Sequence, residues 1–485
     1  MERPSLRLPA PVMYSFPVGA LMDIPTGVYL KGTHDQRVLL GGISNITGYV
    51  GPGNAGKTTI MRFAVLSAIS RIFPAVDDTF YVSYDTEINT HEDRNSKLAA
   101  NFDSLKDEDI IYRGVWQITN KAVYPGNEFW DETKKNLKAK TEDKKARLWE
   151  TAFLDRDRIS PMKVTTPWFY DIDSLSQFIT ADVEKMADTT ELGEKEGNTI
   201  FMRQGLAKAR MLMEMPQVAG RNFSFFMFTA HIGKEIIIPS GPMAPMPKKQ
   251  LDGVPNGEII KGVSNNFFYL LHNCWYITGS RAYLHKEKRS PYYPYNQGEE
   301  VEGDLDLRVT SLRQLRGKNG GSGFTINIVW SQKDGVDPTL TEFDYIKEDN
   351  YGISGNAVTY HLDLYPDVNL MRTTIRTKIR EDAKMRRAIE ITSQMAQIIQ
   401  YHRDLRDYII PPAELREALS LKGYDWDWLL ENTRSWHTLD DEKQPLYPFS
   451  TLDLCRAAKG EYHPYWLEAD CKTVKPFYQK LKEKQ

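Results

Sequence analysis

A glycine-rich run that ends in Lys-Thr is the segment with the most specific chemistry. It comprises Gly51, Pro52, Gly53, Asn54, Ala55, Gly56, Lys57, Thr58 and Thr59. Glycines let successive backbone N–H groups turn toward phosphate oxygens, and a helix that starts there adds its own free N–H groups and dipole. Lys57 would reach the β- and γ-phosphates, and the Thr58 hydroxyl would ligate Mg²⁺. The run therefore predicts a P-loop that binds ATP and Mg²⁺.

Polar residues at three further strand ends would complete a hydrolytic site. An apolar run ends at Asp173, which would hold Mg²⁺ through a water molecule. In the alternative, Asp171 has that role and Asp173 caps the next helix. Another run ends at Glu87, placed to polarise the attacking water as a general base. A third ends at His231, where a polar group can sense the γ-phosphate, although a lone histidine is more often structural.

Alternating strand and helix patterns must position these residues. Short β-branched or aromatic runs alternate with helical patterns, and these runs lie at 46–50, 79–84, 168–172, 223–229, 267–278 and 324–330. Alternation of this kind predicts an α/β fold with a mostly parallel central sheet flanked by helices. A P-loop between strand and helix, as at 46–66, belongs in such a fold.

Changes of texture divide the chain into three predicted parts. Residues 1–40 are rich in Pro and Gly and form an arm. Residues 41–372 form the core, with a charged insertion near 125–160 and a Pro- and Tyr-containing one near 285–305. From 373 to 485 apolar residues recur at helical spacing, which predicts a helical C-terminal domain.

Composition excludes several classes of protein. A net charge of -3 over 485 residues excludes a globally basic nucleic-acid coat, so any contact with DNA must come from local patches. The three cysteines are scattered without metal-ligand spacing, which is typical of a reducing cytosol. No apolar run approaches the ~20 residues that cross a bilayer, and the start lacks a signal-peptide pattern. We expect a soluble cytoplasmic protein that does not enter a membrane.

The order of motifs resembles the RecA/DnaB class of P-loop ATPases, and within it the RecA-type recombinases, including phage versions. The similarity covers roughly residues 41–350 and includes an Asp-x-Glu at 85–87, a Walker B strand end at 172–175 and a helix at 205–213. The resemblance implies a RecA-like core in which Glu87 is the catalytic glutamate. His231 falls where the family has its sensor Gln, or His in some phage relatives.

Family members carry a mobile loop beyond the sensor that contacts single-stranded DNA, and residues 232–263 correspond to it. This stretch combines Pro, Gly and Met with the lysines Lys234, Lys248, Lys249 and Lys261. Lysines would bind phosphates while apolar side chains insert between bases. An ordinary surface loop is the alternative, although long loops in compact domains are usually functional. The loop at 187–199 is acidic, which a DNA-facing loop should not be.

Arg316 and Lys318, in a basic, glycine-rich stretch before the run at 324–330, resemble cations that reach the neighbouring subunit's γ-phosphate in RecA and DnaB proteins. The resemblance implies that they act in trans, so that hydrolysis depends on self-association. A basic turn before a strand is the alternative.

These observations predict a DNA-dependent ATPase of the RecA type. It would bind single-stranded DNA as an oligomer and promote homologous recombination by strand exchange. A DnaB-like hexameric helicase is the first alternative, because residues 318–323 also resemble the finger segment of those helicases. A nucleotide-gated assembly protein with little turnover is the second.

Overall fold

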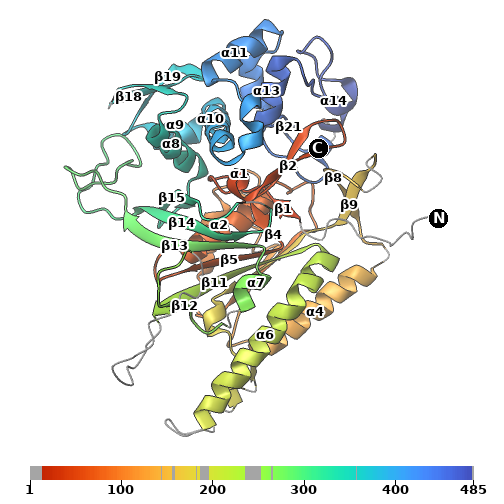
Figure 1. Cartoon of the computed structure of the whole chain (residues 1–485), viewed down its shortest axis with the longest axis vertical. Coiled ribbons are helices and arrows are strands. Elements are labelled where there is room, and N and C mark those ends of the chain that lie inside the picture. The colour runs from red at the N-terminus through yellow and green to blue at the C-terminus, as the bar shows by residue number, and fades with distance from the viewer. Residues whose placement is uncertain are drawn as a thin grey trace.

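The fold is known from a computed structural model of the chain, shown in Figure 1. The structure describes residues 14–143, 145–155, 159–181, 183–185, 196–234, 253–263, 266–319, 321–356 and 358–482, with only the backbone of 196–204 and 266. It is an α/β protein, as the sequence predicts.

A 10-stranded sheet forms the centre of the molecule (Figure 1). Its strands follow the order β16-β15-β14-β13-β5-β11-β10-β6-β7, and β12 pairs with the far part of β11. Their bounds are β5 Ile46–Gly51, β6 Phe80–Asp85, β7 Trp116–Asn120, β10 Trp168–Asp173, β11 Ser224–Lys234, β12 Glu258–Ile260, β13 Asn273–Ala282, β14 Leu307–Gly317, β15 Thr325–Ser331 and β16 Gly335–Val336.

The prediction of a mostly parallel sheet is wrong. Ladders from β7 through β6, β10, β11 and β5 to β13 are parallel, but β14, β15, β16 and β12 are each paired antiparallel. The reason lies in the connections, because β14 joins β15, and β15 joins β16, through short turns. Short turns can link only antiparallel neighbours, whereas parallel strands need a long crossover. The sheet is therefore mixed.

Helices cover both faces of this sheet. α2 (Lys57–Ser70) packs on one face, and α4 (Gly126–Glu142), α6 (Glu196–Asn222) and α7 (Asn266–Leu270) lie on the other (Figure 1). Alternation along β11 fits both layers: Phe225 and Met227 enter the core with α2, and Phe226 and Phe228 enter the core with α4 and α6. A short helix α3 (Glu92–Ala99) follows β6.

The N-terminal segment and the predicted insertion near 125–160 have defined structure. Tyr14, Phe16 and Val18 are buried in the core with α2. Around them lie β1 Ser15–Phe16, α1 Asp23–Thr26, β2 Val28–Lys31, β3 Arg37–Leu40 and β4 Ile43–Ser44. The insertion supplies α4 and an antiparallel hairpin of β8 (Leu148–Leu154) and β9 (Pro161–Thr165).

The C-terminal part has its own hydrophobic core, which also takes in α8. Its elements are α8 Pro338–Asp349, α9 Ile375–Glu381, α10 Ala383–Tyr401, α11 Pro412–Leu421, α12 Trp426–Asn432, α13 Thr451–Lys459, α14 Pro476–Lys482, and a small sheet of β17 Ile353–Gly355, β18 Thr359–Leu362 and β19 Tyr365–Met371. The pair β20 Thr433–Arg434 and β21 Tyr447–Pro448 closes this part. Within the described ranges no helix has the length and apolar character needed to span a membrane.

Candidate functional site

The glycine-rich run forms a loop between β5 and α2, as the sequence predicts. Ile60 N makes the first helical bond, to Gly56 O, so the amides of residues 57–59 precede the ladder. Gly56 has φ +86, and a Cβ there would lie 2.7 Å from the Trp330 ring. A Cβ on Gly53 would meet nothing within 4 Å. The loop is therefore tightly packed at Gly56 and open at Gly53.

Lys57, His231 and Glu87 form a connected chain of polar groups. The Lys57 ammonium donates to Pro52 O at 2.6 Å and lies 3.5 Å from His231 Nδ1. His231 Nε2 lies 2.8 Å from Glu87 Oε1. Because an ammonium can only donate, Nδ1 accepts and Nε2 carries the proton that is donated to Glu87. The structure thus brings together the predicted phosphate-binding lysine, sensor and general base.

The Thr58 hydroxyl donates to Asp173 Oδ2 at 2.7 Å, and Thr229 donates to the other carboxylate oxygen. Asp171 lies two residues earlier on β10. It is fully buried and accepts hydrogen bonds from Tyr81 and Ser83. Burial raises the pKa of Asp171 to about 6. Of the two candidates, Asp173 is therefore the one that meets the P-loop.

A turn after β6 holds Glu87 in place. The Asp85 carboxylate accepts hydrogen bonds from four successive backbone amides, those of residues 87 to 90, at 2.8–2.9 Å. Asn89 donates to Glu87 Oε2 at 3.2 Å. The Glu87 side chain remains 23% exposed, so water can reach it. The Asp85 carboxylate therefore stabilises the turn, and the Glu87 carboxylate remains accessible to react.

Burial has the largest effect on the pKa of the P-loop lysine. Desolvation lowers the pKa of Lys57, and the nearby carboxylates of Asp173 and Glu87 act in the opposite direction. A cation that lacks water and has its acids at a distance gains most from a new anionic partner. The loop therefore presents a partly desolvated cation that an anionic partner would stabilise.

The residues present fit a magnesium–nucleotide complex. Mg²⁺ prefers hard oxygen ligands and usually keeps several waters, so Thr58 and Asp173 would hold it together with phosphate oxygens. Within the described part of the chain, no group of three or more His, Cys, Asp or Glu side chains forms a metal site.

Arg316 and Lys318 lie near the start of β5, whereas the P-loop follows the end of that strand. Asn273 pairs with Thr47 on one side and with Gly317 on the other, while Gly51 lies four residues further along β5. At about 3.3 Å per residue this separates the cations from the P-loop by about 13 Å along the strands alone. They are therefore not placed to serve the P-loop of their own chain. The alternative of a basic turn before a strand does not hold for Arg313 to Gly317, because these residues belong to β14.

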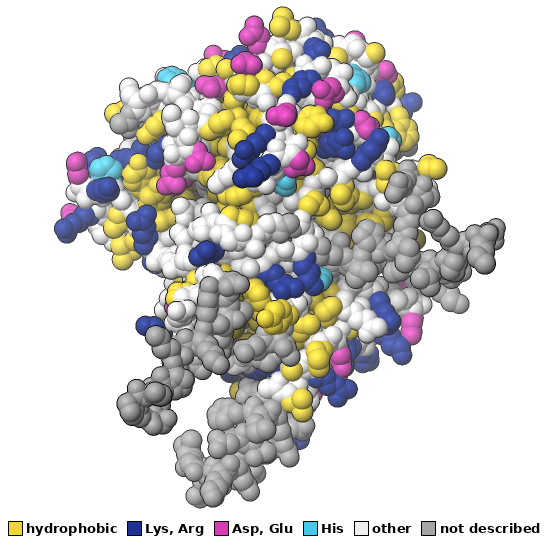
Figure 2. Space-filling model, viewed as in Figure 1, with side chains coloured by type: hydrophobic (Ala, Val, Ile, Leu, Met, Phe, Trp, Pro, Cys, Tyr) yellow, Lys and Arg dark blue, Asp and Glu magenta, His cyan; other side chains and the backbone are white. Residues whose placement is uncertain are grey.

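Positive charge at that end of the strands is not neutralised. Among the described residues neither Arg316 nor Lys318 forms an ion pair, and Arg316 lies over the rings of Phe268 and Tyr269. Burial lowers the pKa of Lys318 and the pKa of His272 (the latter to about 4), and their mutual repulsion with Arg316 adds to this. Figure 2 shows basic side chains beside a histidine and next to the hydrophobic side chains over α7.

Two of the four lysines predicted to bind DNA are described. Lys234 ends β11, paired with Glu258 of β12, and Lys261 N donates to His231 O at 2.8 Å. Lys248 and Lys249 lie outside the described residues. The two described lysines thus lie on β11 and directly after β12, close to His231 in the ladder.

Several polar residues at the site were not predicted from the sequence. Thr229 donates a hydrogen bond to Asp173, and the Ser176 hydroxyl accepts one from the His231 amide. Trp330 donates to Thr310, which donates to Ala55 O in the loop, and Lys208 donates to the carbonyls of Ser176 and Gly262. Thr229 had a signal, because it is the last residue of the predicted run 223–229, two residues before His231. Lys208 had none, since one lysine in an amphipathic helix resembles any other.

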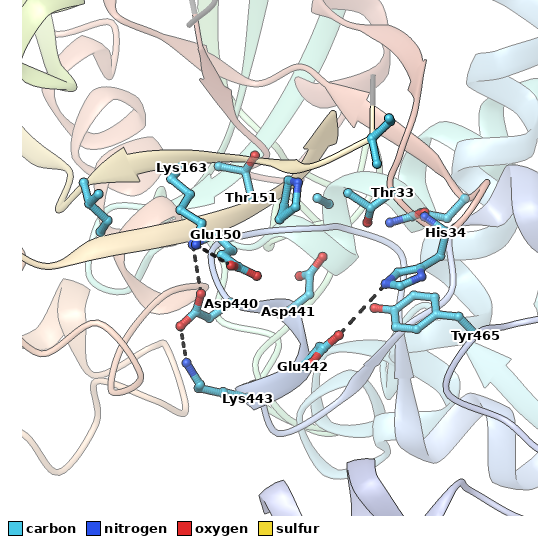
Figure 3. Close-up of a pocket in the computed structure, with 15 residues that line it drawn as sticks. Thr33, His34, Glu150, Thr151, Lys163, Asp440, Asp441, Glu442, Lys443 and Tyr465 are labelled. Carbon is cyan, nitrogen blue, oxygen red and sulfur yellow. Dashed lines mark hydrogen bonds and ion pairs between the residues drawn. The ribbon is translucent and has the colours of Figure 1, made fainter. Parts of the chain in front are cut away.

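A cavity of about 580 Å³ lies away from this site, between the β8–β9 hairpin and residues 33–36 and 440–443 (Figure 3). His34 stacks on Tyr465 at 4.0 Å at one end of it. At the other end Lys163 pairs with Glu150 at 2.9 Å. None of the predicted site residues lines it.

Comparison with known proteins assigns no relative, because no family model and no curated protein matches the chain.

Proposed function

We propose that this chain is a DNA-dependent ATPase of the RecA type, which binds single-stranded DNA as an oligomer and promotes strand exchange. The observation that carries the proposal is the convergence of four strand ends. Lys57 and Thr58 follow β5, Glu87 follows β6, Asp173 ends β10, and His231 of β11 pairs with Gly51 at the end of β5. Hydrogen bonds join Lys57, His231 and Glu87 in one group and Thr58 and Asp173 in a second. A crevice at the carboxyl ends of parallel strands is where α/β proteins bind nucleotides.

Each residue has a distinct part in the proposed hydrolysis. The amides of the loop and Lys57 would bind the phosphates, and Thr58 and Asp173 would hold Mg²⁺, whose charge would support phosphoryl transfer. Glu87 accepts the proton of the water that attacks the γ-phosphorus, and ADP and phosphate are released. His231, hydrogen-bonded to both Lys57 and Glu87, reports whether the γ-phosphate is bound.

Two observations support the proposed partners. Lys234 and Lys261 lie just beyond His231, at the two ends of a stretch that also contains Lys248 and Lys249, so nucleotide and DNA sites would share His231. Arg316 and Lys318, which form no ion pair with any described residue, lie near the other end of the strands from the P-loop, and we propose that a second copy presents its P-loop to them.

The test is the ATPase rate with and without single-stranded DNA, together with retention of that DNA on a filter with and without ATP. We expect DNA to accelerate hydrolysis and ATP to increase retention, and we expect both effects to be absent in Lys57→Ala. Hydrolysis that ignores DNA would defeat the DNA-dependent part of the proposal.

The same purified protein, incubated with ATP and DNA, distinguishes the recombinase from the helicase and from the assembly protein. An open filament on DNA supports the recombinase, whereas closed rings that unwind duplex DNA support the helicase. ATP binding without turnover, with or without DNA, supports the assembly protein.

A further inference from the structure

Lys208 of α6 is a buried lysine that donates to two backbone carbonyls. Its side chain is 1% exposed, and its ammonium donates to Ser176 O at 3.2 Å and to Gly262 O at 2.9 Å. Among the described residues it forms no ion pair, and burial lowers the pKa of Lys208 to about 8. A buried cation held only by carbonyl oxygens is costly, so its position requires an explanation.

Both of its acceptors belong to residues next to the backbone of His231. His231 N donates to the Ser176 hydroxyl at 2.9 Å, and Lys261 N donates to His231 O at 2.8 Å. Ser176 and Gly262 therefore stand on the two sides of His231, and Lys208 joins them. The result is a closed ring of contacts around the residue that bonds Glu87.

The packing between these two segments is tight. Gly262 has φ +67, and a Cβ there would lie 2.7 Å from Ser176 O. Only glycine fits this contact without displacement of the backbone. Ser176 and Gly262 are thus held at one separation, with the Lys208 ammonium bridging them.

We propose that Lys208 is a positioning residue for His231: by fixing Ser176 and Gly262 it aims the imidazole at Glu87. This inference rests on the proposed hydrolytic function of the Glu87–His231 pair. Lys208 touches neither member of the pair and acts only through the backbone segments on either side of His231.

Lys140 provides a matched control. It is also a lysine whose pKa is lowered by burial, to about 7, and it donates to a backbone carbonyl, Asn222 O, at 2.5 Å. It lies over the Trp168 ring, at the opposite end of β10 from Asp173. Removal of its charge tests the general effect of emptying such a position.

The experiment compares Lys208→Met, Lys208→Arg and Lys140→Met. We expect Lys208→Met to lower kcat about tenfold or more with KM for ATP nearly unchanged, because misplacement of a catalytic group slows chemistry rather than binding. Lys208→Arg should recover part of kcat, and Lys140→Met should leave kcat unchanged. In a His231→Ala background Lys208→Met should have no further effect on kcat, since the residue acts through His231.

A second measurement does not depend on turnover. The imidazole ¹⁵N signals of His231, assigned by their loss in His231→Ala, should shift in Lys208→Met and stay in place in Lys140→Met. Unchanged signals, or a kcat loss that is additive with His231→Ala, would overturn the inference. A wild-type protein that does not hydrolyse ATP would instead defeat the proposed function, and the NMR comparison would still decide the role of Lys208.

Discussion

At the scale of single residues, the proposed reaction depends on one carboxylate with access to water. We expect Glu87→Gln to retain ATP binding and to slow turnover about 10²-fold, because the amide cannot accept the proton of the attacking water. Binding is measured with a fluorescent nucleotide and turnover by phosphate release. Glu92→Gln, on an exposed carboxylate of α3, serves as the control. Normal turnover in Glu87→Gln would move the general base elsewhere.

The two aspartates of β10 are separated by a second comparison. Asp173→Asn should lower turnover by about 10–100-fold and weaken its dependence on magnesium, because Asp173 contacts Thr58. Asp171→Asn should keep the magnesium dependence but lower the free energy of unfolding by about 1–3 kcal/mol, since it disturbs buried partners. Magnesium titrations and urea melts measure the two effects. The opposite pattern would assign the metal to Asp171.

At the scale of elements, the loop between β5 and α2 has two glycines with different constraints. Gly56→Ala should lower the free energy of unfolding by about 1–2 kcal/mol, because its φ is +86 and Trp330 fills the space. Gly53→Ala should leave the melting temperature unchanged and weaken ATP binding, since its Cβ would enter open space within the phosphate cradle. Equal melting temperatures for the two variants would contradict this packing.

The packing of α4 on the core predicts a pH-dependent stability. Lys140 has a pKa of about 7 in the folded chain against an ordinary value of 10.5, so the unfolded chain binds more protons between these values. Its burial is therefore destabilising below pH 7, and the free energy of unfolding should rise with pH from 7 toward 10.5. In thermal melts the advantage of Lys140→Met over wild type should be largest near pH 6 and shrink by pH 9.5. A constant difference would show that folding does not shift the pKa of Lys140.

Sequence patterns located four strands of the central sheet within one or two residues, because their β-branched and aromatic runs are largely buried. These are β5, β6, β10 and β15, whereas β11 continues five residues beyond its predicted end. The predicted strand over 267–278 begins instead with α7, since Phe267 and Leu271 pack under Gly48 in a contact that local sequence does not reveal. β7 and most of β14 were missed, the latter because alternating basic residues near Gly317 suggested a turn.

Candidate site residues were found where a motif fixes both type and position. The loop from Gly51 to Thr59, Glu87, Asp173 and His231 meet in one place, because consecutive parallel strands end at the same edge. Residues that support them through backbone contacts, such as Ser176 and Lys208, were not found. Their positions are set by how α6 crosses the sheet, which no local pattern encodes.

At the scale of the whole molecule, we expect a site completed by two subunits. Lys318→Ala should bind ATP normally but lose most hydrolysis by the assembled protein, because a cation acting in trans contributes a factor of about 10³ or more in related phosphoryl-transfer enzymes. Mixing Lys318→Ala with Lys57→Ala subunits should restore part of the activity, since each supplies what the other lacks. Phosphate release across mixing ratios measures this, with Lys286→Ala as an exposed control.

Absence of recovery at every ratio, although each variant still assembles, would contradict action in trans. Full hydrolysis by Lys318→Ala alone would remove the role of this lysine altogether.

In the proposed assembly each copy has a direction, because the P-loop lies at one end of the strands of the central sheet and Arg316 and Lys318 lie near the other end. An open head-to-tail oligomer of n copies has only n−1 interfaces. The P-loop of one terminal copy would therefore bind a nucleotide that it cannot hydrolyse. Turnover per copy should then climb with oligomer length and level off, while a closed circle has no idle terminus. The fraction of inactive sites would be largest in the shortest oligomers. A newly nucleated assembly would therefore hydrolyse little ATP per copy until it had grown.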